Sequence, residues 1–185
     1  MTPPSCWARE RLAGALRLAA AAFALAPSSA FGDEAHRYRS EPGRFHVELP
    51  ARSASVAEME GSKFSITDND VRHTAFAHGA EFAVEIHDIP RFAEFLLTSR
   101  YILDRTVEGM FEDIGARGLA SVDVERHGAP AREVAFEIPE RDVVGELLVV
   151  LADERLYLVT VRHPRSVEPP STAARFFESF YFWRE

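Results

Sequence analysis

Cysteine is almost absent from this chain of 185 residues. Its one cysteine, Cys6, lies within the first 30 residues, so the remaining chain has no disulfide and depends on its core for stability. Long apolar runs are missing too. The run at residues 18–26 is about half of the roughly 20 apolar residues that cross a bilayer, and no later segment is long enough. We therefore expect no transmembrane segment in the mature protein.

The common catalytic motifs are missing as well. The chain has no Gly-x-Ser-x-Gly and no His-Glu-x-x-His, which are the signatures of many serine hydrolases and zinc proteases. Gly115 and Gly118 follow a predicted helix instead of preceding one, so their amides cannot hold a phosphate as a P-loop does. Because a catalytic triad is defined by geometry, an enzyme is not excluded. We assign no catalytic, metal-binding or cofactor-binding residue.

Positive charge is scarce. The chain carries 21 basic and 29 acidic residues, and the part after residue 30 keeps 18 basic and 28 acidic residues, a net charge of −10. Nucleic acids and anionic membranes attract basic surfaces. The charge therefore argues against both as the main partner, although it says nothing about the fold.

The first 30 residues have the pattern of a secretory signal peptide. Arg9 and Arg11 precede the apolar run, Pro27 ends it, and small residues follow at positions 28–30. Cleavage after Ala30 or after Gly32 fits this pattern. We therefore expect a signal peptide at residues 1–30, a polar tether at residues 31–43 and a single α+β domain at residues 44–185, located in the periplasm or outside the cell.

Hydrophobic periodicity predicts the elements of this domain. Apolar residues alternate with polar ones in the first half, which predicts strands at residues 45–49, 64–66, 71–77 and 82–86. The period then changes to three and four, which predicts an amphipathic helix at residues 103–114, ending at Gly115, after a shorter helix near residues 92–97. In the second half, strands are predicted at residues 122–124, 134–138, 147–151 and 156–161, and a short helix follows residues 169–171.

Two of these strands differ from the rest. Residues 147–151 are apolar at every position and residues 156–161 nearly so, which requires cover on both faces. We therefore expect this hairpin at the centre of an antiparallel sheet of about six or seven strands, with helices on both faces in an α/β/α sandwich. The aromatic residues at 176–183 have helical spacing, which favours a place in the core over a partner-binding patch.

Five short segments resemble small exported domains of the PsbP/Mog1 type. They are residues 45–50 (FHVELP), 82–90 (FAVEIHDIP), 128–133 (GAPARE), 155–158 (RLYL) and 175–180 (RFFESF). Ala131 stands where the family's turn usually has glycine. The resemblance implies an α/β/α sandwich used as a binding or assembly module and supplies no catalytic residues. The photosystem role of the plant members is not implied, because fold and function separate easily.

Three pairs of histidine and glutamate invite a metal-binding interpretation. His46 and Glu48 share one strand face, Glu85 and His87 share another, and His78 and Glu81 flank a turn. Two neighbouring strands with such pairs could offer four ligands to zinc. Alternation on a solvent-facing strand produces the same spacing without any ligand, and we favour that interpretation. Residues 68–70 (DND) are too closely spaced for a calcium loop and are expected to form a turn.

Two functions remain open from the sequence. The first is an exported, non-catalytic binding or assembly module that docks on a protein or an envelope complex. The alternative is a hydrolase or metal-dependent enzyme acting on an envelope substrate. A partly buried cluster of histidine and carboxylate side chains in a pocket would favour the enzyme.

The signal peptide gives the first testable prediction. The exported protein is expected to begin at Phe31 or Asp33, because the small residues and Pro27 stand where signal peptidase requires them. Intact-mass measurement of the exported protein distinguishes the two sites. A full-length mass in the membrane fraction would contradict the prediction.

Overall fold

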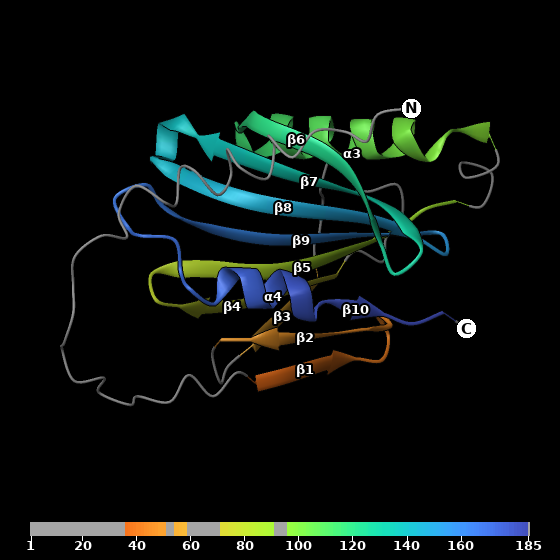
Figure 1. The fold of residues 1–185 in the computed structure, drawn as a ribbon, viewed down its shortest axis with the longest axis horizontal. Coiled ribbons are helices and arrows are strands. Elements are labelled where there is room, and N and C mark those ends of the chain that lie inside the picture. The colour runs from red at the N-terminus through yellow and green to blue at the C-terminus, as the bar shows by residue number, and fades with distance from the viewer. Residues whose placement is uncertain (1–35, 51–53, 59–70, 91–95, 185) are drawn as a thin grey trace, which may run out of the picture. The chain divides into compact units, whose positions relative to one another are not determined.

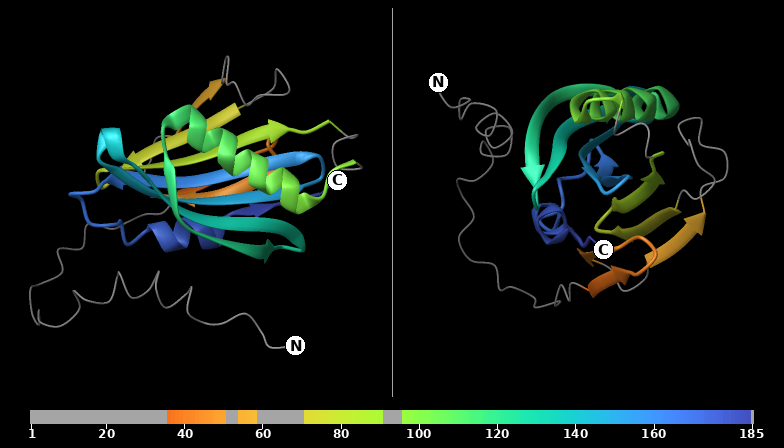
Figure 2. Two further views of the ribbon diagram at one scale, coloured as in Figure 1. Left: turned by 90° about the horizontal axis from the view of Figure 1, so that it is seen from above. Right: turned by 90° about the vertical axis from the view of Figure 1, so that its right-hand side faces the viewer.

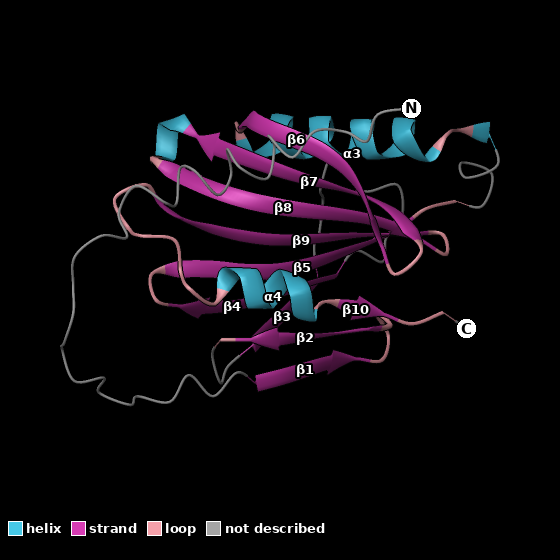
Figure 3. Ribbon diagram, in the orientation of Figure 1, coloured by secondary structure: helices cyan, strands magenta, loops and turns pink. Residues whose placement is uncertain are grey.

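Antiparallel strands make up most of the residues that the computed structural model describes (Figures 1 and 3). The structure describes residues 36–50, 71–90 and 96–184 together with the backbone of residues 54–58. All of them lie in one unit, Glu34–Glu185. The predicted signal peptide, the predicted strand at residues 64–66 and the acidic turn at residues 68–70 lie outside the described residues, as does most of the short helix predicted near residues 92–97.

The larger sheet has seven strands in the order β3-β4-β5-β9-β8-β7-β6, and every neighbouring pair is antiparallel. Its strands are β3 (Ala54–Glu58), β4 (Val71–Ala77), β5 (Ala80–Asp88), β6 (Arg117–Arg126), β7 (Ala129–Ile138), β8 (Val143–Ala152) and β9 (Arg155–Pro164). A single 3-10 turn, η1 (Pro139–Arg141), connects β7 to β8. The prediction of a mainly antiparallel α+β fold is confirmed.

The β8–β9 hairpin lies inside the sheet, as the sequence predicts. Leu147 and Val149 face one side, while Leu148 and Val150 face the other, and each is at most 1% exposed. Gly145 of β8 is also required by packing, since a Cβ atom there would lie only 2.6 Å from Cζ of Phe136.

A second sheet, which the sequence did not predict, has the order β1-β2-β10. It contains β1 (His36–Ser40), β2 (Phe45–Leu49) and β10 (Tyr181–Phe182). Two predictions are therefore corrected. The strand at residues 45–49 belongs to this smaller sheet, and residues 36–40 of the expected tether form a strand paired with β2. The polar sequence of β1 concealed it, because only one of its faces is covered.

One face of the larger sheet is covered by helix α3 (Ser99–Ile114). The side chain of Thr98 accepts a hydrogen bond from the backbone of Tyr101 and caps the start of the helix. Gly115 ends it with φ 68°, a left-handed conformation in which glycine carries no steric cost. Ile102 and Leu103 are buried against the apolar side chains of β7, β8 and β9.

The opposite face is covered chiefly by the smaller sheet, with the short helix α4 (Ala173–Ser179) beside it (Figure 2). The expectation of helices on both faces is thus corrected, because a sheet supplies most of the second layer. The two sheets also meet through a polar contact, in which Oη of Tyr38 lies 2.8 Å from Nδ1 of His73. In the described part of the chain, no helix is long and apolar enough to cross a membrane.

The C-terminal aromatic residues form much of the core between the two sheets. Phe176, Phe180 and Phe182 are 1–3% exposed. The ring of Phe176 packs edge-on against Phe82 at 5.3 Å, and Phe180 lies 5.6 Å from Tyr157. These residues confirm the core interpretation, whereas Tyr181 is 42% exposed and lies on the surface.

The core role of these rings is tested by alanine substitution. Phe176→Ala is expected to lower the free energy of unfolding by about 3–5 kcal/mol, because it leaves a cavity in a closely packed region. The matched control Tyr181→Ala, at the exposed residue directly after Phe180, is expected to cost less than about 1 kcal/mol. Chemical denaturation of both variants measures the difference, and equal losses would show that the position of these rings is wrong.

Candidate functional site

The three predicted pairs of histidine and glutamate do not converge on a metal site. His46 and Glu48 lie on β2, while Glu85 and His87 lie on β5, which belongs to the other sheet. Glu81 is engaged by Arg72 and Arg162. Among the residues that the structure describes, no three side chains of histidine, cysteine, aspartate or glutamate come together as a metal-ligand set.

Glu85 and His87 are nevertheless not the solvent-facing residues that the sequence suggests. They are only 7% and 5% exposed, and β5 is buried along nearly its whole length. The alternation of β5 correctly separates its two faces. It does not reveal that both faces are covered, so the expectation that the pair is exposed is wrong.

Glu85 belongs to a chain of ion pairs across three strands. Nε of Arg162 on β9 donates to Oε2 of Glu81 at 2.6 Å, and Glu81 also accepts from Arg72 on β4. The same Arg72 lies 3.1 Å from Oε1 of Glu85. The strand register explains this order, since Arg162 is directly opposite Glu81 and Arg72 is directly opposite Glu85. His87 extends the chain, with Nε2 at 3.8 Å from Glu85.

The surroundings of Glu85 determine its charge. Burial alone would raise its pKa, but the polar contact with His87 and the charges of Arg72, His87 and Arg162 together hold the pKa below the ordinary value of 4.5. Glu85 is therefore ionised at neutral pH. A carboxylate held between arginines is a poor proton donor, and its place in the sheet suits a structural role.

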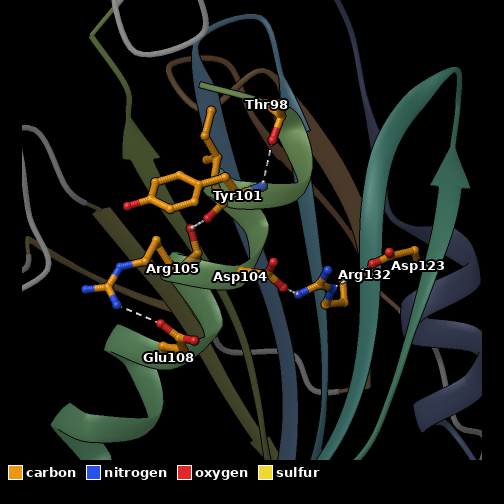
Figure 4. Close-up of polar contacts among 9 residues, drawn as sticks. Thr98, Tyr101, Asp104, Arg105, Glu108, Asp123 and Arg132 are labelled. Atoms are coloured by element: carbon orange, nitrogen blue, oxygen red, sulfur yellow. Dashed lines mark hydrogen bonds and ion pairs between the residues drawn. The ribbon is translucent and has the colours of Figure 1, made fainter. Parts of the chain in front are cut away.

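A second polar centre fixes α3 to the sheet (Figure 4). Arg132 of β7 donates to Asp123 of β6 at 2.7 Å and to Asp104 of α3. Its side chain is 9% exposed, so the guanidinium is shielded from solvent. Burial alone would lower the pKa of Arg132, but the two carboxylates outweigh it and raise the pKa, so the residue keeps its charge. Arg132 thus joins the helix to the β6–β7 hairpin.

An apolar patch surrounds the start of α3. Leu97, Ser99 and Ile102 line a shallow depression of about 230 Å³, which Pro130 and Leu151 complete. Next to it, Leu96 and Tyr101 are 71% and 50% exposed. Small-molecule pockets usually have volumes of about 300–1,000 Å³. This depression is smaller, and its exposed apolar rim suits contact with another macromolecule.

The outward face of the smaller sheet is the other notable surface. Strand pairing places Arg39, His46 and Tyr181 in one row across β1, β2 and β10. The ring of His46 stacks on Tyr181 at 5.2 Å, and Cζ of Arg39 lies 4.6 Å from the ring centre of Trp183. The helical spacing of the aromatic residues predicts Tyr181 and Trp183 in the core, and the structure corrects this. The overlooked signal is the return to alternation after α4, where Phe182 faces in and its neighbours face out.

Comparisons with known proteins identify the fold. No family model and no curated protein matches the chain. The solution structure of cyanobacterial PsbP (CyanoP) from Synechocystis sp. PCC 6803 matches with a TM-score of 0.57 and 13% identity, over 86% of this chain and 99% of that one. The class is therefore a PsbP-like fold, and this likeness does not single out the Mog1 type.

A second solved structure, of the protein of unknown function PA94 from Pseudomonas aeruginosa, is more distant. It matches with a TM-score of 0.37 and 14% identity, over 70% of this chain and 83% of that one. This score is too low to establish a shared fold.

The buried ion pairs give a prediction for stability and its pH dependence. Glu85→Gln is expected to destabilise the protein at pH 7 by about 1–3 kcal/mol, because it removes a buried carboxylate that pairs with Arg72, while Arg72 keeps its pair with Glu81. Since folding lowers the pKa of Glu85, its ionised form stabilises the fold above pH 4.5, and that contribution is lost as the pH falls through the lowered pKa.

The difference between wild type and Glu85→Gln should therefore shrink in acid. Urea denaturation at pH 7 and near pH 3 measures this change. The control Glu108→Gln affects an exposed pair with Arg105 and should cost less than about 1 kcal/mol at either pH. A Glu85→Gln variant as stable as the control at pH 7 would instead support the expectation from the sequence that Glu85 faces solvent.

Proposed function

We propose that this chain is an exported, non-catalytic binding or assembly module that docks on a protein or an envelope complex. The likeness of its fold to cyanobacterial PsbP over 86% of the chain is the main support. Export rests on the signal-peptide pattern of the first 30 residues. Docking is the role that the resemblance to PsbP/Mog1-type domains implies.

The side chains add a second argument. The buried charged groups of the larger sheet neutralise one another, with Glu81 and Glu85 held by Arg72 and Arg162. A catalytic acid or base needs a pKa near the working pH and access to substrate. Exposed aromatic and apolar side chains gather at the start of α3, and Tyr181 lies on the outward face of the smaller sheet, whereas Phe76 of β4 and Leu119 of β6 are single exposed residues. These surfaces are the sites that we propose for a partner.

One observation favours the alternative, a hydrolase or metal-dependent enzyme acting on an envelope substrate. His87 and Glu85 lie together in a buried position, as general acids and bases often do. Elemental analysis of the purified protein tests a metal-dependent form of this alternative. One metal per chain, lost on chelation together with the melting temperature, would place the enzyme ahead of the binding module.

Photo-crosslinking in intact cells tests the binding module. A crosslinking amino acid is placed at Tyr101 on α3, at Tyr181 on β10 or at Glu140 in the exposed β7–β8 connection. A module should give a discrete adduct from Tyr101 or Tyr181 and none from Glu140, because only the first two lie on the proposed surfaces. Equal labelling at all three positions, or no adduct at any of them, would contradict docking at these surfaces.

A further inference from the structure

The outward face of the smaller sheet gathers positive charge in an acidic chain, whose net charge is −8. Pairing of β1 with β2 places Arg37 opposite Glu48 and Arg39 opposite His46, and pairing of β2 with β10 places Tyr181 beside His46. Directly opposite residues share a face of the sheet. We call Arg37, Arg39, His46, Tyr181 and Trp183 the cationic face.

Ring contacts fix the arrangement of this face. His46 stacks on Tyr181 with 24° between the rings, and His127 packs against the same tyrosine at 4.8 Å. Arg39 lies over the ring of Trp183. Backbone pairing holds this end of the chain too, since the amide of Trp183 donates to the carbonyl of Arg44 at 3.1 Å. A partner would therefore meet side chains that are already ordered, which lowers the entropic cost of binding.

Among the residues that the structure describes, the acidic side chains nearby do not fully neutralise the face. Glu41 pairs with Arg39 at 2.7 Å, and Glu48 pairs with Arg175 of α4. Arg37 then remains in excess over these two carboxylates. Three arginines therefore face two carboxylates, which leaves the cationic face with a net positive charge. The pKa of His46 beside them is lowered first by burial and then by Arg37, Arg39 and His127, while Glu48 opposes them.

We propose that the cationic face docks an acidic segment of a partner protein. Tyrosine, tryptophan and arginine are the residues that most often carry the energy of protein–protein contacts. A bilayer with anionic lipids would expose the whole acidic chain to repulsion, whereas a short acidic segment meets only the local positive charge. The inference rests on the proposed binding function and names the chemistry of the partner.

Trp183 provides a direct readout of binding. The chain has two tryptophans, Trp7 and Trp183. In the full chain with Trp7→Phe, tryptophan emission therefore reports only on the cationic face. The probe is a ten-residue peptide of alternating glutamate and serine, titrated at low ionic strength, and a peptide of alternating lysine and serine is its control. We expect a saturable change of emission with the glutamate peptide alone.

Charge reversal locates the binding site. Arg37→Glu with Arg39→Glu is expected to weaken binding at least tenfold. The control double variant, Arg100→Glu with Arg105→Glu, changes two exposed arginines of α3 and alters the net charge of the protein by the same amount. It should weaken peptide binding less than threefold. Because Arg39 contacts Trp183, Arg37→Glu alone is measured as well, and a loss of about threefold or more is expected. Thermal melts confirm that each variant is folded.

Three results would overturn the inference. Equal losses in the two double variants would show an effect of net charge only. A response of Trp183 to phosphatidylglycerol vesicles but not to the glutamate peptide would identify a lipid surface instead. If Trp183 responds to neither probe, the proposal of an acidic partner is wrong. Discrete crosslinks from Tyr101 would still support the binding module in that case.

Discussion

The β8–β9 hairpin is apolar on both of its faces, and the arrangement of the other elements depends on it. A side chain such as Leu148 or Leu158 stabilises the fold by roughly 1.5–3 kcal/mol when it is fully buried, so both faces need a covering layer. Helix α3 covers one face, and the smaller sheet with α4 covers the other. The two layers are built differently because only one stretch of the sequence has enough helical period to form a long amphipathic helix.

The layer between the two sheets explains why the C-terminal end of the chain is essential to the core. Phe176 and Phe180 come from the last 15 residues, yet they pack on residues that lie about 20–100 positions earlier, such as Tyr157 and Phe82. The same segment then supplies β10, which completes the smaller sheet beside β2. Folding of the smaller sheet is therefore coupled to docking of α4, since neither is covered without the other.

Much of this fold could be predicted from the sequence, and the errors have a common cause. Apolar residues that recur at every second position predicted most of the described strands, and apolar residues that recur every three to four positions predicted α3. The unbroken apolar composition of the β8–β9 hairpin predicted its place at the centre of the sheet. Periodicity separates the two faces of a strand but does not say which sheet the strand joins or what covers each face. The second sheet, strand β1 and the burial of Glu85 and His87 could therefore not be predicted from periodicity.

The two sheets use charge in different ways, and this difference is the reason for proposing a partner surface on the smaller one. In the larger sheet, Arg72 and Arg162 face Glu85 and Glu81 directly across the strands, so a slip of the register by one residue would separate every pair. Those charges favour one register and are neutralised within the fold. On the smaller sheet, Arg37 and Arg39 face solvent beside ordered aromatic rings, and Glu41 pairs with Arg39 but not with Arg37 in the described part of the chain. Charge that the fold does not neutralise is available to a partner of opposite sign, and the rings beside it add apolar contact area for the same partner.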